Sequence, residues 1–335
     1  MRYKKHVIIT VLISLLLPLT VYFAAFQYLK QLSNRIFIED KFAKSIHMST
    51  WLEKSNKDID YIFIGSSSTQ NMVSTYIMNE HNLTTYNYSR PSVFLLDMPY
   101  MVEKAIAEGP KHIVLGLSLA ELYKIDPFYK TEPMFPSQFD YDFINQAIGT
   151  HYQFNSLSER VFNEYRLKDI VFRINGLYTE QQIKQRLDRL RVKEEDLDCE
   201  VTNYRGGKNR TVFLCQNGDG AIVTRDKPSY KQTRQRLQIN DLSHSRITLL
   251  NALIGYCRQH DIVPVVLFLP IMYDKRLTYD KEYLYSLIET DNIIDTTNRY
   301  KDNYSLWSDR NHLNYMGRKI YTHYLMDQFE GLTKQ

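Results

Sequence analysis

Four short apolar runs, separated by segments with helical periodicity, recur along this 335-residue chain. The runs occupy residues 60–64, 111–116, 262–269 and 292–295, and helix-like segments such as 93–108 and 247–260 lie between them. A run of this length bounded by turn residues is typical of a buried strand. Parallel strands need a crossover connection, which is usually a helix. The alternation therefore predicts an α/β fold with a mostly parallel sheet covered on both faces.

The N-terminus carries an uncharged run from Val7 to Phe26, preceded by Arg2, Lys4 and Lys5. Twenty residues at about 1.5 Å each match a hydrocarbon core of about 30 Å. The run is long for a signal peptide and lacks a good small-x-small cleavage site, although a cleaved signal and a buried helix remain alternatives. The basic flank predicts a cytoplasmic N-terminus. We therefore expect a single-pass protein of a bacterial inner membrane, with its bulk extracytoplasmic or periplasmic.

The pattern divides the chain into four parts. Residues 1–29 form the cytoplasmic stub and anchor, and residues 30–56 a helical stalk. The α/β domain comprises 57–119 and 241–335, and residues 120–240 interrupt it. That block is too long for a connection inside a compact domain, which indicates an insertion or cap. The net charge of +4 is small, and Lys and Arg are interspersed with Asp and Glu along the chain. This pattern disfavours nucleic acid as a partner.

The cysteine and histidine patterns exclude common metal sites. None of the three cysteines forms a C-x-x-C pair, and the nine histidines show no ligand spacing, so no metal is expected. In an oxidising compartment Cys199 and Cys215 could form a disulfide across a Gly-rich turn, with separate free thiols as the alternative. Cys257 lies in an apolar helical stretch and is expected to be a buried thiol.

The first chemical motif is Gly65-Ser66-Ser67-Ser68-Thr69, directly after a predicted strand. Ligands of open parallel sheets bind beyond the carboxyl ends of the strands. A turn of small residues there lets a hydroxyl face the crevice and places backbone N–H groups at a helix start. Such clusters also serve as simple helix caps, and the motif alone leaves both interpretations open.

The second motif places Asp309 and His312 just before the last amphipathic helix. The carboxylate can accept from one imidazole nitrogen while the other meets a hydroxyl, which makes the histidine a general base. The same spacing recurs at Asp241 and His244. We interpret that second copy as a helix-capping sequence, because a strand and much more chain follow it.

Together the two motifs resemble the first and last blocks of SGNH hydrolases. The last block, D-x-x-H-L-N-x-x-G, agrees at Asp309, His312, Leu313, Asn314 and Gly317. The resemblance is closest to the membrane-anchored envelope branch, which includes the D-alanyl transfer protein and alginate O-acetylation proteins. It implies a flavodoxin-like three-layer α/β/α fold with Ser67 as nucleophile and Asp309 and His312 completing the triad.

The oxyanion blocks depart from the family pattern. The family supplies donors from a glycine in N-x-x-x-x-G and an asparagine in G-x-N-D. Here Ser92 stands in the glycine's position after Asn87, and Ser118 stands in the asparagine's position after Gly116. The Ser92 N–H and the Ser118 hydroxyl are the corresponding donors, although a lost donor typically costs roughly 100- to 1000-fold in rate.

The resemblance implies a cofactor-free serine esterase or O-acyltransferase acting on acyl groups, with acetyl favoured, of a cell-envelope polysaccharide. Its partners would be that glycan or an acyl donor, and a membrane-bound acyltransferase is a further candidate. The departures in the oxyanion blocks motivate an alternative, a non-catalytic binding or assembly subunit of a glycan-modifying or export complex. The sequence leaves hydrolysis and transfer equally open.

Overall fold

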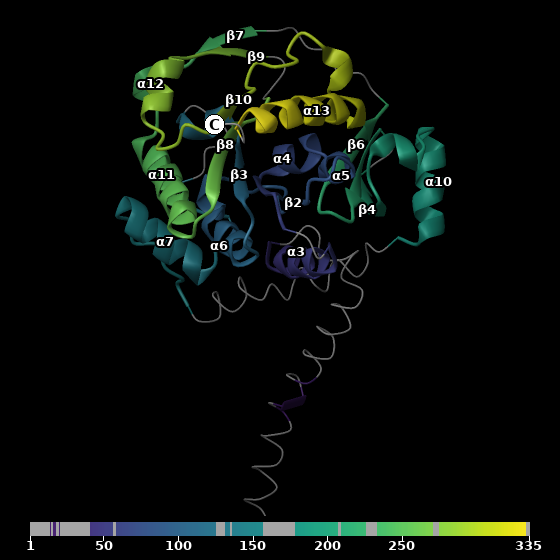
Figure 1. The fold of residues 1–335 in the computed structure, drawn as a ribbon, viewed down its shortest axis with the longest axis horizontal. Helices are drawn as coiled ribbons and strands as arrows, with labels where there is room; N and C mark the ends of the chain where they lie inside the picture. The colour runs from purple at the N-terminus through teal and green to yellow at the C-terminus, as the bar shows by residue number, and fades with distance from the viewer. Residues whose placement is uncertain are drawn as a thin grey trace, which may run out of the picture.

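The computed structural model describes residues 41–55, 58–124, 131–134, 136–156, 178–206, 209–225, 233–270 and 275–332, together with residues 14, 16, 17 and 20. At its centre lies a five-stranded sheet with the order β10-β8-β3-β1-β2 (Figure 1). Every strand pairing in this sheet is parallel. The strands are β1 (Tyr61–Gly65), β2 (Thr85–Asn87), β3 (His112–Leu117), β8 (Val263–Phe268) and β10 (Ile293–Asp295).

The predicted α/β class and mostly parallel sheet are confirmed. Four of the five strands coincide with the four apolar runs, whereas β2 was not predicted because Thr-Tyr-Asn is short and polar. Alternate side chains of β1 enter two different cores. Ile62 and Ile64 pack with α3 (Lys41–Ser55), α6 (Pro99–Ala107), α7 (Gln138–Ile148) and α11 (His244–Gln259). Tyr61 and Phe63 pack with α4 (Ser67–Met72), α5 (Thr75–Glu80) and α13 (Tyr315–Leu332).

The second half of the expected stalk is part of the folded domain. Met48 and Leu52 of α3 are buried in the core that contains Tyr86. The predicted anchor, Val7 to Phe26, lies outside the described residues apart from positions 14, 16, 17 and 20. Within the described part of the chain, no helix is both long and apolar enough to cross a membrane.

The expected insertion, residues 120–240, contributes to two places. Helix α7 packs on the main core through Ile144. The segment 178–225 instead builds a separate unit from α10 (Glu180–Leu190), the 3-10 turn η3 (Glu194–Leu197) and an antiparallel sheet, at the right of Figure 1. That sheet has the order β4-β5-β6 and comprises β4 (Val201–Gly206), β5 (Arg210–Cys215) and β6 (Gly220–Thr224).

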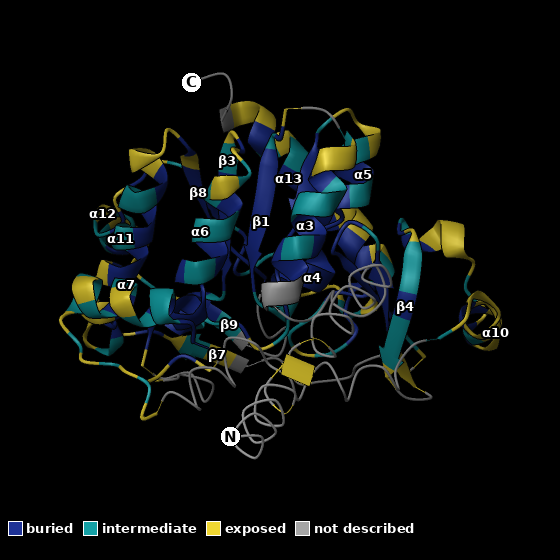
Figure 2. Cartoon of the chain, turned by 90° about the horizontal axis from the view of Figure 1, so that it is seen from below, coloured by how far each residue is buried: buried dark blue, intermediate teal, exposed yellow. Residues whose placement is uncertain are grey.

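The separate unit has its own small core. One face of its sheet packs against Ile183 and Leu187 of α10, whose other side is exposed at the rim of the molecule (Figure 2). Cys199 and Cys215 form a disulfide in this core, with their Cα atoms 5.3 Å apart.

A buried ion pair fixes this unit to the main domain. Arg318 of α13 donates from Nη2 to Asp219 Oδ2 at 2.8 Å, and both side chains are almost fully inaccessible. The same oxygen accepts from the backbone N–H of Thr75 at 2.8 Å. Burial raises the pKa of Asp219, and the guanidinium of Arg318 is the largest of the interactions that oppose this shift. The insertion is thereby held against α5 and α13, and α13 packs against α4, the helix that begins at Ser67.

The remaining short elements complete the connections. They are η1 (Leu95–Asp97), η2 (Leu119–Leu122), η4 (Ile239–Asp241), α12 (Lys281–Ser286), η5 (Tyr304–Leu306) and the parallel pair of β7 (Thr233–Arg236) with β9 (Lys275–Thr278).

Candidate active site

The turn after β1 presents Ser67 at the carboxyl edge of the central sheet. Strand β1 ends at Gly65, and α4 begins at Ser67. The Ser66 side chain caps this helix by accepting from the backbone N–H of Ser68 at 3.2 Å. The capping interpretation therefore applies to Ser66, and Ser67 is left for another role.

Close packing explains why small residues surround this turn. The Thr69 side chain lies directly against Gly65 and Gly116, where a Cβ atom on either glycine would overlap it. Its hydroxyl donates to the Gly116 carbonyl at 3.3 Å. Helix α4 is thus seated on the ends of β1 and β3, between which the strand order of the sheet reverses. Ligand sites of parallel sheets occur at such a switch point.

Contacts within the loop before α13 explain the leucine, asparagine and glycine of the D-x-x-H-L-N-x-x-G block. Leu313 is fully buried and bridges to Trp307. Asn314 donates to the Ser305 carbonyl at 2.6 Å and accepts from the Gly317 N–H at 3.0 Å. A side chain on Gly317 would overlap the Leu306 carbonyl. These contacts close the loop and fix the positions of Asp309 and His312.

The structure brings Ser67, His312 and Asp309 together as a hydrogen-bonded chain. His312 Nε2 lies 2.9 Å from Ser67 Oγ, and His312 Nδ1 lies 2.8 Å from Asp309 Oδ1. The carboxylate can only accept, so Nδ1 carries the proton and Nε2 offers its lone pair to the hydroxyl. The His312 side chain is 14% exposed, so part of the ring borders solvent. This is the geometry of a nucleophile, its general base and an orienting carboxylate.

Several donors keep Asp309 ionised. Burial alone would raise the pKa of Asp309, but the hydrogen bond and charge of His312, the charge of Arg210 and the N–H of Asn311 hold that pKa at about 2. The Asn311 and His312 N–H groups donate to Oδ1 at 2.8 and 3.0 Å. The carboxylate is therefore charged at neutral pH and oriented towards the imidazole.

Arg210, at the start of β5, is a site residue that the sequence did not reveal. Its Nη2 lies 2.8 Å from Asp309 Oδ2 and 3.3 Å from His312 Nδ1. The guanidinium and the protonated Nδ1 are both donors, so they share the carboxylate as acceptor. The expected insertion thus supplies a cation to the triad's acid. An isolated arginine after a Gly/Asn-rich turn carries no sequence signal for this position.

Neither expected oxyanion residue is joined to the triad. Among the hydrogen bonds between described residues, none links Ser92 or Ser118 to Ser67, Asp309 or His312. The Ser118 N–H donates instead to Glu121 at 3.2 Å, and Ser118 begins the turn η2. Ser92 is exposed and has a φ of 60°, the left-handed conformation that glycine adopts most readily.

The second D-x-x-H copy lies elsewhere, at the start of α11. Ser243 is the N-cap residue of that helix, and His244 is its first residue and is exposed. The Asp241 carboxylate accepts from the Gln238 N–H at 3.3 Å, closing the turn η4. This agrees with a helix-start role rather than a catalytic one.

Neither a scan against protein-family models nor searches of curated proteins and of solved structures found a match to this chain.

Proposed function

We propose that this protein is an SGNH-type serine esterase or O-acyltransferase, membrane-anchored and extracytoplasmic. Its substrate would be an acyl ester, with acetyl favoured, of a cell-envelope polysaccharide. The observation that carries the proposal is the chain of contacts from Ser67 Oγ through His312 to Asp309, with heavy-atom distances of 2.9 and 2.8 Å. The strand order, 2-1-3-4-5 when the five central strands are numbered along the chain, supports a flavodoxin-like three-layer SGNH fold.

The chemistry follows from these positions. Ser67 Oγ attacks the acyl carbonyl while His312 Nε2 accepts the hydroxyl proton, and Asp309 stabilises the resulting imidazolium. The imidazolium then protonates the departing sugar oxygen, which leaves an acyl group on Ser67. Water or an acceptor hydroxyl gives a proton to His312 and attacks this ester, releasing the acid or the transferred ester.

Labelling with a fluorophosphonate probe tests the proposal on the detergent-solubilised full chain. We expect Ser67 to be labelled, and Ser67→Ala and His312→Ala to abolish both labelling and the hydrolysis of an acyl ester. Ser66→Ala and Ser68→Ala are matched controls, since these flanking hydroxyls cap α4 and bind the Asn311 carbonyl. Activity that survives Ser67→Ala would exclude this serine as the nucleophile.

A second function, a non-catalytic binding or assembly subunit, is favoured by the placement of Ser118. Ser118 stands where the family has an asparagine, so a hydroxyl would replace an amide as oxyanion donor, and its N–H is already engaged by Glu121. If the chain is required for a glycan modification in cells but Ser67→Ala and His312→Ala retain that modification, the second function holds.

A further inference from the structure

A pocket of about 510 Å³ lies between the insertion and the start of α13. Its wall on the main domain includes Asn314 and Tyr315, which directly follow the catalytic loop. Its wall on the insertion includes Thr224, the strand partner of Arg210. Cross-strand partners lie about 5 Å apart, so the pocket begins one strand spacing from the arginine that contacts Asp309.

The lining of this pocket is cationic. Arg191 and Arg225 contribute to it, and none of the described residues that line it is acidic. The Arg225 guanidinium donates to the Arg189 carbonyl at the end of α10, and both Arg191 and Arg225 are exposed. Arg191 has a left-handed φ of 56° at the cap of the same helix. Two guanidinium groups with five N–H donors each are suited to a carboxylate or phosphate group.

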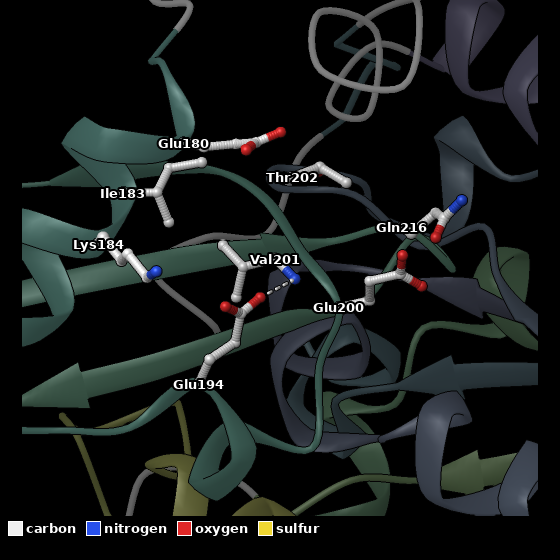
Figure 3. Close-up of a pocket in the computed structure, with 8 residues that line it drawn as sticks. All are labelled: Glu180, Ile183, Lys184, Glu194, Glu200, Val201, Thr202 and Gln216. Atoms are coloured by element: carbon white, nitrogen blue, oxygen red, sulfur yellow. Dashed lines mark hydrogen bonds between the residues drawn. The ribbon is translucent and has the colours of Figure 1, made fainter.

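A second pocket of the same unit has the opposite character. It measures about 480 Å³, and its charged lining consists of Glu180, Glu194, Glu200 and a single lysine, Lys184 (Figure 3). Glu194 is engaged by the Val201 N–H at 3.1 Å. Among the described residues, no group of three or more His, Cys, Asp or Glu side chains could hold a metal ion.

We propose that the pocket lined by Arg191 and Arg225 binds an oxyanion group, a carboxylate or a phosphate, of the polymer segment next to the ester that Ser67 attacks. This inference rests on the proposed function and specifies its substrate class as an anionic glycan. Tyr315, which also lines the pocket, supplies an aromatic surface of the kind that packs against a sugar ring. The insertion would thus select the polymer, and the triad would act on its acyl group.

Calorimetric binding to the full-length Ser67→Ala protein tests the pocket without requiring catalysis. The probes are a trimer of galacturonic acid, the same trimer with its carboxyls reduced to alcohols, and the reduced trimer carrying one phosphate monoester. We expect the neutral trimer to bind at least about tenfold more weakly than a charged one, the scale of one charge-assisted hydrogen bond. Tighter binding of the galacturonic acid trimer would identify the anion as a carboxylate, and tighter binding of the phosphorylated trimer would identify it as a phosphate.

Arginine substitutions localise the effect. Arg225→Gln and Arg191→Asn should each weaken binding of the charged trimer about tenfold, and the asparagine tolerates the left-handed backbone. Lys184→Gln is the matched control, because it removes one positive charge from the same unit at the acidic pocket. Equal affinity for charged and neutral trimers, or equal losses in all three variants, would overturn the pocket assignment. Charge-selective binding without fluorophosphonate labelling would sustain the pocket and overturn only the esterase proposal.

Discussion

Arg210 Nη2 lies 2.8 Å from Asp309 Oδ2, so a strand of the insertion contacts the carboxylate of the proposed triad. Asp309 retains three other donors, the N–H groups of Asn311 and His312 and the imidazole Nδ1–H. These donors already orient the carboxylate, so Arg210 adds only its charge, which helps to lower the pKa of Asp309. The Arg210 side chain is 43% exposed, which weakens the pair by solvent screening.

We accordingly expect Arg210→Ala to lower kcat/KM for a small acyl ester by less than about tenfold, against at least about 100-fold for Asp309→Ala. In the double variant the Arg210 effect should disappear, because its acceptor is gone. Steady-state kinetics on the four proteins measure this coupling. Arg276→Ala is the control, since the Arg276 side chain is about as exposed as that of Arg210 but pairs with Asp302, an acid outside the proposed triad. Additive losses would show that Arg210 acts independently of Asp309.

The ion pair of Asp219 and Arg318 is expected to dominate the attachment of the insertion. Arg318→Met should lower the free energy of unfolding by about 3–5 kcal/mol, because it leaves a buried carboxylate without its counter-ion. Adding Asp219→Asn should restore part of that loss. Urea unfolding provides the measurement. Lys319→Met on the same helix removes a pair in which the lysine is half exposed and its partner is Asp198, and should cost less than about 1 kcal/mol. Equal effects at both positions would contradict this account.

The disulfide between Cys199 and Cys215 closes a loop with a sequence separation of 16. A disulfide that closes a loop of this size stabilises the folded state by roughly 3 kcal/mol relative to the reduced chain. Reductant should therefore lower the Tm of the wild type but leave that of the Cys199→Ala, Cys215→Ala variant unchanged.

Burial raises the pKa of Cys257 to about 12, so its thiol should react with a thiol reagent only after unfolding. A rapid reaction in the native state would place Cys257 at the surface.

His47 predicts how stability depends on pH. Burial, with Lys44 and Lys54 nearby, lowers the pKa of His47 from 6.5 to about 4. Below pH 6.5 the unfolded chain binds a proton at His47 that the folded chain excludes. The contribution of His47 to the free energy of unfolding is therefore fully present above pH 6.5 and decreases as the pH falls towards 4. The loss at pH 4 is about 3 kcal/mol from this group.

Replacing His47 with glutamine isolates that contribution. Glutamine can keep a hydrogen bond to Tyr86, whose hydroxyl lies 2.7 Å from His47 Nδ1, but it does not titrate. Chemical unfolding at pH 7, 5.5 and 4 should give a flatter dependence for His47→Gln than for the wild type. Parallel curves would show that His47 is not the group responsible.

Local sequence pattern was sufficient to predict four of the five central strands and the pairing of two of the three triad residues. The apolar runs predicted β1, β3, β8 and β10 because a buried strand must be apolar on both faces. Asp309 and His312 are three residues apart, so their pairing depends only on one tight loop. Strand β2 was missed because its three residues, Thr85–Asn87, carry no such run.

Tertiary structure decided the remaining relationships. Ser67 meets His312 only because parallel strands end at one edge of the sheet and α13 packs beside α4. Arg210 and the pocket of Arg191 and Arg225 depend on how the antiparallel unit docks through Asp219 and Arg318. Such long-range contacts leave no periodicity in the sequence, since they are set by packing between segments whose own patterns are independent. The sequence pattern thus determined four of the five central strands and the chemical groups, and only the fold determined which of those groups meet.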